Sequence, residues 1–476
     1  MMIGNRYFFF ALWVTTFLFW SLQSKAVDFE AYLKRHKVSA VTLKNSSYCE
    51  WKNETSDNQI NGYRTEELVR IASVSKLFTS YLALKKFGPF HRFQTQLTII
   101  PVGNNLVDLE IRGSDDPYFN LEKVFFMISE LNRMGVEKIR KISFDSHFRV
   151  ALNWRQSMEV IWSEGMVWKP EIHRNYVTQQ ISPEDSQKNL QAALNTSGWS
   201  NRAKTSYQRL VRNAKAERIQ LTTQPKLSFQ EISFNENMSP RPQGGKNFVL
   251  RSLPLFKYLK DLNKYSINFL ADQIFLVSGG VPALRDLLVN DVRLRESDFQ
   301  FYTGSGLPLR DTDRINEDGE RRADNLATCS SVIRTIQSMA QFLNSYPVPN
   351  EERAELNGRQ NLLLSDVMMV IGTDSDGTIG ARPNIAKNVV AKSGTLTAVT
   401  NAAGYASTRN GIFWFGVFIT GKGLRELRNS TMGLLVSENR GGKEVTALSP
   451  VEFDEFIPFD SKSSIRSYEP ISVRMN

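Results

Sequence analysis

The segment from Ile71 to Gly88, IASVSKLFTSYLALKKFG, constrains this chain most, because it places a lysine inside an otherwise apolar pattern. Its aliphatic and aromatic residues predict a largely buried helix, yet Ser73 and Lys76 lie within it. Residues three apart on a helix share one face, so the serine hydroxyl and the lysine amine can meet. Apolar surroundings disfavour a charged amine. The segment therefore predicts a nucleophile beside its base, and a lysine that extends to the surface is the alternative.

The beginning of the chain, residues 1–26, has the pattern of a signal peptide. Arg6 precedes an apolar run from Tyr7 to Leu22, and the small residues Ser24 and Ala26 stand at the spacing that a signal peptidase recognises. An uncleaved membrane anchor is the less favoured alternative, because the run is shorter than the about 20 residues that a bilayer span needs. We expect cleavage after Ala26 and an exported, periplasmic or otherwise extracytoplasmic chain with no stable membrane anchor.

Composition narrows the classes of partner and site. Removal of residues 1–26 lowers the formal net charge from +10 to +8, which suits anionic wall polymer or lipid head groups. Basic–aromatic repeats that would predict nucleic-acid binding are not found. The four histidines lack metal-ligand spacing, and Asp374 to Gly380 (DSDGTIG) predicts a turn instead of a calcium loop, so we expect no metal and no cofactor. Cys49 and Cys329 could form a disulfide, but we favour two separate, half-buried thiols.

The order of predicted elements indicates an α/β (α+β) protein in which one domain interrupts another. Helical patterns flank Ser73 and return after residue 246, apolar strands follow near residue 390, and SAVTLKN at 39–45 predicts a further strand. The Pro- and Gly-containing stretch at 237–247 is typical of a boundary. The predicted divisions are a signal peptide (1–26), a first catalytic part (27–95), an inserted strand-rich domain (96–245), a second catalytic part (246–442) and a tail (443–476).

Two further motifs accompany the Ser-x-x-Lys pair. Lys392-Ser393-Gly394 ends an apolar strand. Ser-x-Asn occurs at 266–268, between two apolar helical segments, and at 233–235, in strand-like surroundings. We favour Ser266 and Asn268, because a tight helix–helix turn can aim both side chains into one cleft. Ser-x-x-Lys, Ser-Asp-Asn and Lys-Thr-Gly together are the motif set of penicillin-binding proteins and serine β-lactamases.

The flanking sequence resembles the low-molecular-mass class C penicillin-binding proteins, the D-alanyl-D-alanine carboxypeptidase/endopeptidase family (peptidase family S13). The resemblance implies a transpeptidase fold, with an antiparallel sheet flanked by helices and an inserted domain. Only 193 residues separate Ser73 from Ser266, which implies a form without a third domain. Thr303 and Pro308 stand where the family usually has aspartate and serine. These departures affect the expected shape of the cleft rim but not the catalytic residues. Six stretches between about residues 60 and 420 carry the likeness: KKFGPFHRF, IRGSDDPYF, KYSINFLAD, GSGL, DGTIGAR and AKSGTLTAVTNAAGYAS.

The expected activity is that of a serine D,D-peptidase, a carboxypeptidase and/or a cross-link-cleaving endopeptidase, which acts on peptidoglycan stem peptides through an acyl-serine. β-Lactams are the expected inhibitors, and no protein inhibitor can be identified. A β-lactamase and a catalytically silent wall-binding protein are the alternatives. The implied roles are Ser73 as nucleophile, Lys76 as general base, Ser266 as proton relay, Asn268 and Lys392 as further catalytic groups, Lys392, Ser393 and Gly394 at the substrate carboxylate, and the N–H groups of Ser73 and Thr395 as oxyanion hole.

Overall fold

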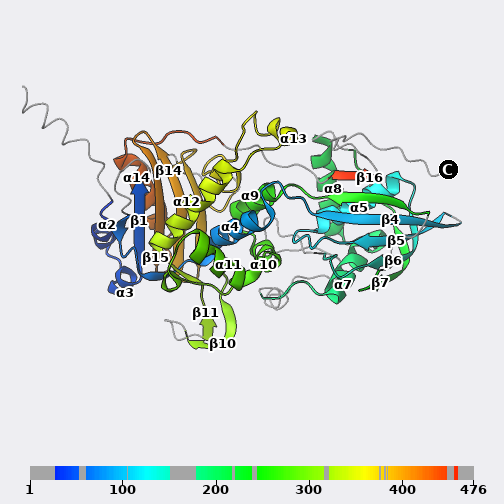
Figure 1. Cartoon of the computed structure of the whole chain (residues 1–476), viewed down its shortest axis with the longest axis horizontal. Helices are drawn as coiled ribbons and strands as arrows, with labels where there is room; N and C mark the ends of the chain where they lie inside the picture. Colours follow the sequence, from blue (N-terminus) through cyan, green and yellow to red (C-terminus); the bar gives the residue numbers. More distant parts are fainter. Residues whose placement is uncertain are drawn as a thin grey trace, which may run out of the picture.

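The computed structural model divides into two packed halves (Figure 1). Predictions for the signal peptide and for most of the tail lie outside the described residues. Within the part that the structure describes, no helix is both long and apolar enough to cross a membrane. The structure describes residues 27–52, 60–103, 105–150, 178–216, 220–238, 244–315, 321–374, 377–379, 382, 384–446 and 455–458.

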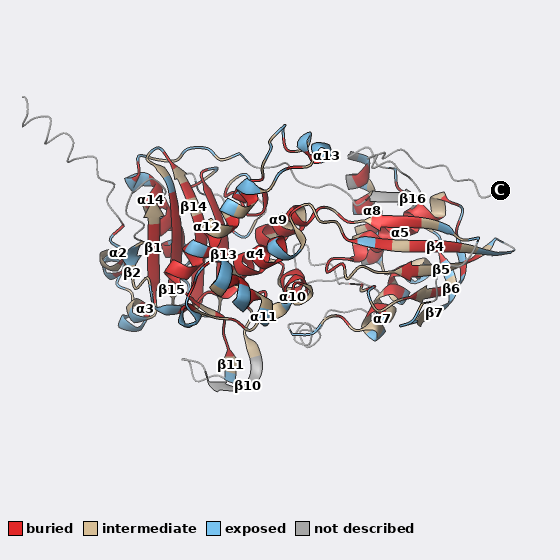
Figure 2. Ribbon diagram, in the orientation of Figure 1, coloured by how far each residue is buried: buried red, intermediate tan, exposed pale blue. Residues whose placement is uncertain are grey.

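A five-stranded antiparallel sheet forms the centre of one half (Figure 1). Its order is β13-β14-β15-β1-β2, so a strand from early in the chain pairs directly with one from late in the chain. The three late strands are almost entirely buried (Figure 2), which their near-continuous apolar sequences predict. The strands are β1 (Ser47–Lys52), β2 (Asn61–Tyr63), β13 (Val389–Leu396), β14 (Val399–Thr408) and β15 (Gly411–Thr420).

Helices cover both faces of this sheet. One face shares its apolar core with α4, α9, α10, α11 and α12, and the other with α2, α3 and α14. The helix α4 contains Lys76 and begins just after Ser73, and ten of its thirteen residues are buried. The helices are α2 (Phe29–Arg35), α3 (Ala40–Lys44), α4 (Ser75–Phe87), α9 (Leu255–Tyr265), α10 (Asn268–Val277), α11 (Gly280–Asp286), α12 (Cys329–Ser345), α13 (Asn350–Arg353) and α14 (Arg425–Glu438).

Two small sheets lie beside the main one. The strand order β3-β12-β9 brings the residues that precede Ser73 next to the start of α12. The Ile71 backbone N–H donates to the Asn325 carbonyl oxygen at 3.2 Å, which extends this pairing toward the predicted nucleophile. The strands are β3 (Leu68–Arg70), β9 (Phe299–Gln300), β12 (Leu326–Thr328), and the separate pair β10 (Leu309–Ile315) and β11 (Arg321–Ala323).

The other half is a six-stranded mixed sheet with its own apolar core. Its order is β16-β8-β4-β5-β6-β7, and the pairs β5–β6 and β6–β7 are parallel, with helices in the connections. The strands β4 to β8 lie between Gln94 and Arg251, and the edge strand β16 comes from the tail, for which the sequence predicted no element. Its elements are β4 (Gln94–Gly103), β5 (Leu106–Arg112), α5 (Leu121–Arg133), β6 (Lys138–Phe144), α7 (Pro183–Leu194), α8 (Asn201–Ala216), β7 (Ser228–Phe234), β8 (Lys246–Arg251) and β16 (Glu455–Pro458).

A buried charged cluster connects the two halves. Lys123 on α5 contacts Asp116 at 2.6 Å, and both side chains are nearly inaccessible to solvent. The hydroxyl of Tyr258, on α9 of the half that contains the five-stranded sheet, lies 3.3 Å from both carboxylate oxygens of Asp116. Because a buried charge is stable only when paired and hydrogen-bonded, this cluster ties the second sheet to the helices of the first half.

The predicted strand at residues 39–45 is wrong. Residues 40–44 form the helix α3, and the side chain of Ser39 accepts a hydrogen bond from the Thr42 backbone N–H at 3.1 Å. Such an N-cap satisfies a backbone donor that would otherwise be unpaired. Val41 is 65% exposed, so the apolar residue that suggested a strand does not face a core.

The preference for two separate thiols is also wrong. Cys49 on β1 and Cys329 at the start of α12 form a disulfide, with their Cα atoms 5.9 Å apart. Both cysteines are completely buried. The packing of α12 across β1 and β15 brings these residues together, although 280 positions separate them in the sequence.

Candidate active site

Ser73 lies in a 3-10 turn, Ala72–Val74, that leads directly into α4. Ala72 has a φ of 48°, a left-handed value that residues with a Cβ rarely adopt. Gly306 packs so closely against this turn that a Cβ there would lie 1.9 Å from the Ala72 carbonyl oxygen. Backbone strain of roughly 1–3 kcal/mol per residue is characteristic of functional sites. The surroundings thus hold Ser73 in a fixed, half-buried position.

Lys76 is completely buried one turn of helix after Ser73. Its Nζ lies 3.0 Å from Ser73 Oγ, 2.7 Å from Asn268 Oδ1 and 2.7 Å from the Ser305 carbonyl oxygen. A neutral amine can donate to the two oxygens that only accept and receive the third hydrogen bond from the serine hydroxyl. The structure therefore brings the predicted nucleophile and base into direct contact.

The favoured Ser-x-Asn motif forms the turn between α9 and α10. Ser266 ends α9 with a left-handed backbone (φ 56°), and Asn268 is the first residue of α10. The residue between them, Ile267, is 3% exposed and anchors the turn in the core. Asn268 reaches Lys76, and Ser266 Oγ accepts a hydrogen bond from Lys392 Nζ at 2.9 Å. The alternative motif lies elsewhere, since Ser233 belongs to β7 of the second sheet.

Lys392, Ser393, Gly394 and Thr395 follow one another along β13, the strand beside the Ser73 turn. A Cβ on Gly394 would lie 2.8 Å from the Ile71 carbonyl oxygen, so glycine permits the strand and the turn to pack closely. Lys392 is completely buried and also donates to the Ser393 carbonyl oxygen at 2.8 Å. Thr395 is exposed, and its part in an oxyanion hole stays a prediction.

Burial lowers the pKa of Lys76, and the carboxylate of Asp272 acts in the opposite direction. Asp272 lies on α10 and is 1% exposed. Burial raises the pKa of Asp272, against the lowering effect of Lys76. Its Oδ1 accepts from the Ser305 N–H at 2.7 Å, and Ser305 in turn offers its carbonyl oxygen to Lys76. The buried lysine and the buried acid are therefore coupled through one residue of the GSGL loop.

The pKa of the second lysine is also lowered. Burial lowers the pKa of Lys392 most strongly, and the positive charges of Lys76 and Arg428 add to the effect. A substrate carboxylate placed beside Lys392 would oppose this shift, because an opposite charge favours the ammonium form. The site is therefore suited to receive a negative charge next to β13.

Three residues that the sequence analysis did not select contribute to this centre. Asp272 follows Asn268 by four positions, a spacing that puts both on one face of α10 and could have drawn attention to it. Ser305 and Thr378 lie in the GSGL and DGTIG stretches, in which the sequence analysis assigned neither residue a role. Thr378 Oγ1 lies 2.7 Å from Ser393 Oγ, so it orients the hydroxyl on the catalytic strand.

Thr303 of the GSGL loop and Asp374, which lies shortly before Thr378, each have a structural role. Thr303, which replaces the expected aspartate, donates its hydroxyl to the Leu307 carbonyl oxygen and accepts from the Gly306 N–H, at 2.8 Å and 3.2 Å. The loop that presses on the Ser73 turn is thus closed by a threonine. Asp374, considered above for calcium, instead pairs with Lys260 at 2.7 Å.

Residues 43–159 match the D-Ala-D-Ala carboxypeptidase 3 (S13) family. No curated protein sequence matches the chain significantly. Among solved structures, the chain is similar to Bd0816, a predatory endopeptidase from Bdellovibrio bacteriovorus solved with the immunity protein Bd3460. The identity is 26% and the TM-score is 0.71, over 85% of this chain and 96% of that one.

It is also similar to Bd3459, a predatory peptidoglycan endopeptidase of the same organism, with 26% identity and a TM-score of 0.70 over 86% of this chain and 96% of that one. Penicillin-binding protein 4 (dacB) from Haemophilus influenzae shares the fold, with 18% identity and a TM-score of 0.50 over 85% of this chain and 99% of that one. The Ser73–Lys76 contact lies within the segment that matches the S13 family, and over most of its length the chain is similar to these two endopeptidases; together these findings support a relationship to the S13 penicillin-binding proteins.

Proposed function

We propose that this chain is an exported serine D,D-peptidase that cleaves cross-links between D-alanine and a diamino acid in peptidoglycan, and that penicillins acylate it at Ser73. The observation that carries the proposal is the 3.0 Å contact between the Ser73 hydroxyl and the completely buried amine of Lys76. A buried amine with a lowered pKa can accept the hydroxyl proton near neutral pH.

Acylation begins when Ser73 Oγ attacks the carbonyl carbon of the D-alanine that is joined to the diamino acid, and the hydroxyl proton passes to Lys76 Nζ. Asn268, which accepts from Lys76, holds the amine in place. The bond to the leaving nitrogen breaks as that nitrogen takes a proton from the Ser266 hydroxyl, which Lys392 can replace across their 2.9 Å contact. The products are an acyl ester on Ser73 and a free amine, and water then hydrolyses the ester.

Recognition of the substrate carboxylate depends on β13. Lys392 supplies the cation, and Ser393, oriented by Thr378, supplies a hydroxyl donor. Two backbone donors, the N–H groups of Ser73 and Thr395, are proposed for the developing oxyanion, where each preorganised donor contributes roughly 3–4 kcal/mol.

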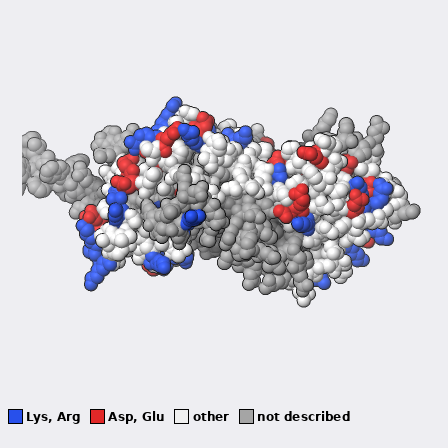
Figure 3. Space-filling model, turned by 90° about the horizontal axis from the view of Figure 1, so that it is seen from below, with Lys and Arg blue, Asp and Glu red and all other residues white. Residues whose placement is uncertain are grey.

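Three observations support an exported wall enzyme. The similar chains Bd3459 and Bd0816 are endopeptidases, and Bd3459 has been solved acylated by penicillin G. A disulfide joins the two cysteines, and disulfides persist mainly in oxidising compartments. Residues 1–26 have the leader pattern described above. Surface charge is not one of these three observations, because on the face shown in Figure 3 the described basic side chains are interspersed with acidic ones.

The test combines a covalent label with a wall digest. Fluorescent penicillin should label the native chain and a Ser437→Ala control on the exposed part of α14, but not Ser73→Ala. Labelling of Ser73→Ala to the native level would refute the nucleophile. Purified wall should lose its cross-linked muropeptide dimers, and dimers that persist while pentapeptides disappear would restrict the activity to carboxypeptidase. Rapid turnover of nitrocefin would favour the β-lactamase alternative.

A further inference from the structure

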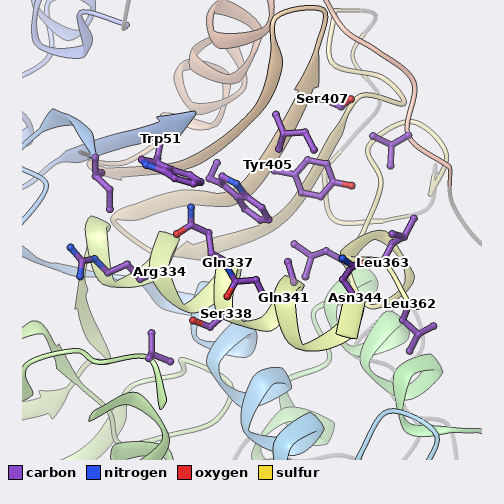
Figure 4. A pocket seen from close by; sticks show the side chains of 17 residues that line it. Trp51, Arg334, Gln337, Ser338, Gln341, Asn344, Leu362, Leu363, Tyr405 and Ser407 are labelled. Atoms are coloured by element: carbon purple, nitrogen blue, oxygen red, sulfur yellow. The ribbon is translucent and has the colours of Figure 1, made fainter. Parts of the chain in front are cut away.

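A second hollow lies on the catalytic half, and none of its lining residues belongs to the Ser73–Lys76 centre. It is a groove of about 820 Å³ between one face of α12 and the strands β1, β14 and β15 (Figure 4). Leu363 lies at one end of the groove, and β1, the strand that carries the disulfide-bonded Cys49, borders the other end. The groove is therefore built on regular secondary structure of this half.

One wall of the groove is a row of aromatic side chains. Trp414 on β15 is directly opposite both Trp51 on β1 and Tyr405 on β14 in the strand register. Directly opposite residues point to the same face of a sheet, so the three rings form a row across three strands. The ring centres of Tyr405 and Trp414 are 5.5 Å apart. Two strand spacings give the row a length of roughly 10 Å, enough for two or three sugar rings.

The opposite wall is a polar stripe of α12. Gln337, Gln341 and Asn344 are spaced by four and three residues, which puts them on one helix face. The other face of α12 is buried in the core, so the helix presents its amides to the groove. Figure 4 shows Gln337 and Gln341 rising from the helix toward the strands that carry Trp51 and Tyr405. The groove therefore offers flat apolar rings on one side and amide groups on the other.

Two features indicate that a ligand completes the groove. The Nε2 of Gln337 and the Nε1 of Trp414 are buried donors with no acceptor among the described residues, and Trp414 is only 8% exposed. An unsatisfied buried donor costs roughly 1–3 kcal/mol. At the rim, Leu363 and Ile412 are each 38% exposed, and they are two of the six large apolar side chains that the described surface exposes to this degree.

The charge of the lining selects the class of ligand. Arg334 is the lining residue with a charge, and no carboxylate is among the described lining residues. The described lining offers no carboxylate to pair with a free amine, which disfavours stem peptides. Pyranose rings match it, since their C–H faces pack on aromatic rings and their hydroxyl and acetamido oxygens accept from amide and indole N–H groups.

We propose that this groove binds the glycan strand of peptidoglycan, a chain of N-acetylated amino sugars, and so holds the enzyme on its polymer while the Ser73 centre cleaves stem peptides. The proposal rests on the proposed function for the identity of the polymer. Attachment to the strand raises the effective concentration of stem peptides at the catalytic centre. Loss of the groove should therefore slow digestion of insoluble wall and leave acylation by a small penicillin unchanged.

The experiment uses the full chain and sugar probes that lack peptide. Wall stripped of stem peptides by an amidase is tested by co-sedimentation, and tetra-N-acetylchitotetraose is titrated against tryptophan fluorescence, which Trp51 and Trp414 should report. The variants are Trp51→Ala and Gln337→Ala/Gln341→Ala, with Gln191→Ala on an exposed position of α7 as the matched control. We expect both groove variants to lose at least tenfold in glycan affinity while their penicillin labelling matches that of the control.

Each outcome separates the two proposals. A native chain that labels with penicillin but binds neither sugar probe would overturn the glycan site and leave the peptidase intact. Sugar binding that is unchanged in the glutamine variant would also overturn it, and a groove filled by another segment of this chain would give this lack of response. A native chain that binds sugar but never labels with penicillin would contradict the proposed catalytic function alone.

Discussion

Replacement of Asp272 by asparagine should move the pH dependence of acylation toward acid. Asp272 Oδ1 accepts from the Ser305 N–H, and an asparagine oxygen can keep this bond. The charge, however, is lost. The carboxylate raises the pKa of Lys76, so its removal lowers that pKa and allows the neutral amine to persist at lower pH. Lys392 on β13, the other charged group that faces Lys76, is unchanged in the variant.

The contacts give the size of the effect. Lys76 Nζ to Ser305 O and Ser305 N to Asp272 Oδ1 are both 2.7 Å. Two such bonds across one residue put the Lys76 ammonium and the Asp272 carboxylate on the order of 6 Å apart. At an effective dielectric constant of about 20, their attraction is roughly 3 kcal/mol, which corresponds to a shift of ~2 pH units in the pKa of Lys76. Burial also raises the pKa of Asp272, so the acid is only partly ionised and the expected shift is about 1–2 pH units.

The assay is the second-order rate of labelling by fluorescent penicillin between pH 5 and pH 9. Because Lys76 must be neutral, the rate should rise with pH through its pKa, and this rise should occur at lower pH in Asp272→Asn. Asp366→Asn is the matched control, since Asp366 is equally buried but pairs with Arg359 away from Ser73. A rise that stays in place, or moves to higher pH, would refute the coupling of Asp272 to Lys76.

Three further outcomes are expected. Ser266→Ala should slow acylation roughly 10²-fold or more, because the relay to the leaving nitrogen is lost; a rate within a factor of three of the native rate would exclude that role. Gly306→Ala should abolish most labelling, since its Cβ would collide with the Ala72 carbonyl oxygen, whereas Gly441→Ala, with open space around it, should label normally. Cys329→Ala should lower the free energy of unfolding, measured in denaturant, by about 2–5 kcal/mol. Reduction of the disulfide in the native protein should lower it by an equal amount. Unchanged stability in both would contradict a constraining disulfide.

Local spacing predicted the parts of the site that depend on one helix or one turn. Ser73 and Lys76 meet because they are three residues apart, and the Ser266–Asn268 turn was found because two apolar helices leave little room between them. Asp272 was not selected, although it is one turn after Asn268. The role of a buried carboxylate on a helix can be assigned only when its partner is known. Here the partner, Lys76, lies on another helix much earlier in the sequence.

Long-range packing decided what the sequence could not. The disulfide depends on how α12 crosses β1, and the sequences of these two elements do not specify their crossing angle. Likewise, β16 is a short strand whose partner β8 lies far earlier in the chain, so no local period could place the tail at the edge of the second sheet. The helix α3 was mistaken for a strand because four of its residues, Val41 to Lys44, alternate in polarity, and the capping serine was the stronger signal.

The pairing of β1 with β15 has a consequence for how this protein matures. Residues 47–52 are made long before their neighbour in the sheet, residues 411–420. Contacts between such distant segments slow folding and leave apolar strands unprotected in the meantime. Until β15 is made, β1 therefore lacks its neighbour in the sheet, and a shortened chain that stops before β13 lacks Lys392 and the strand that packs on the Ser73 turn.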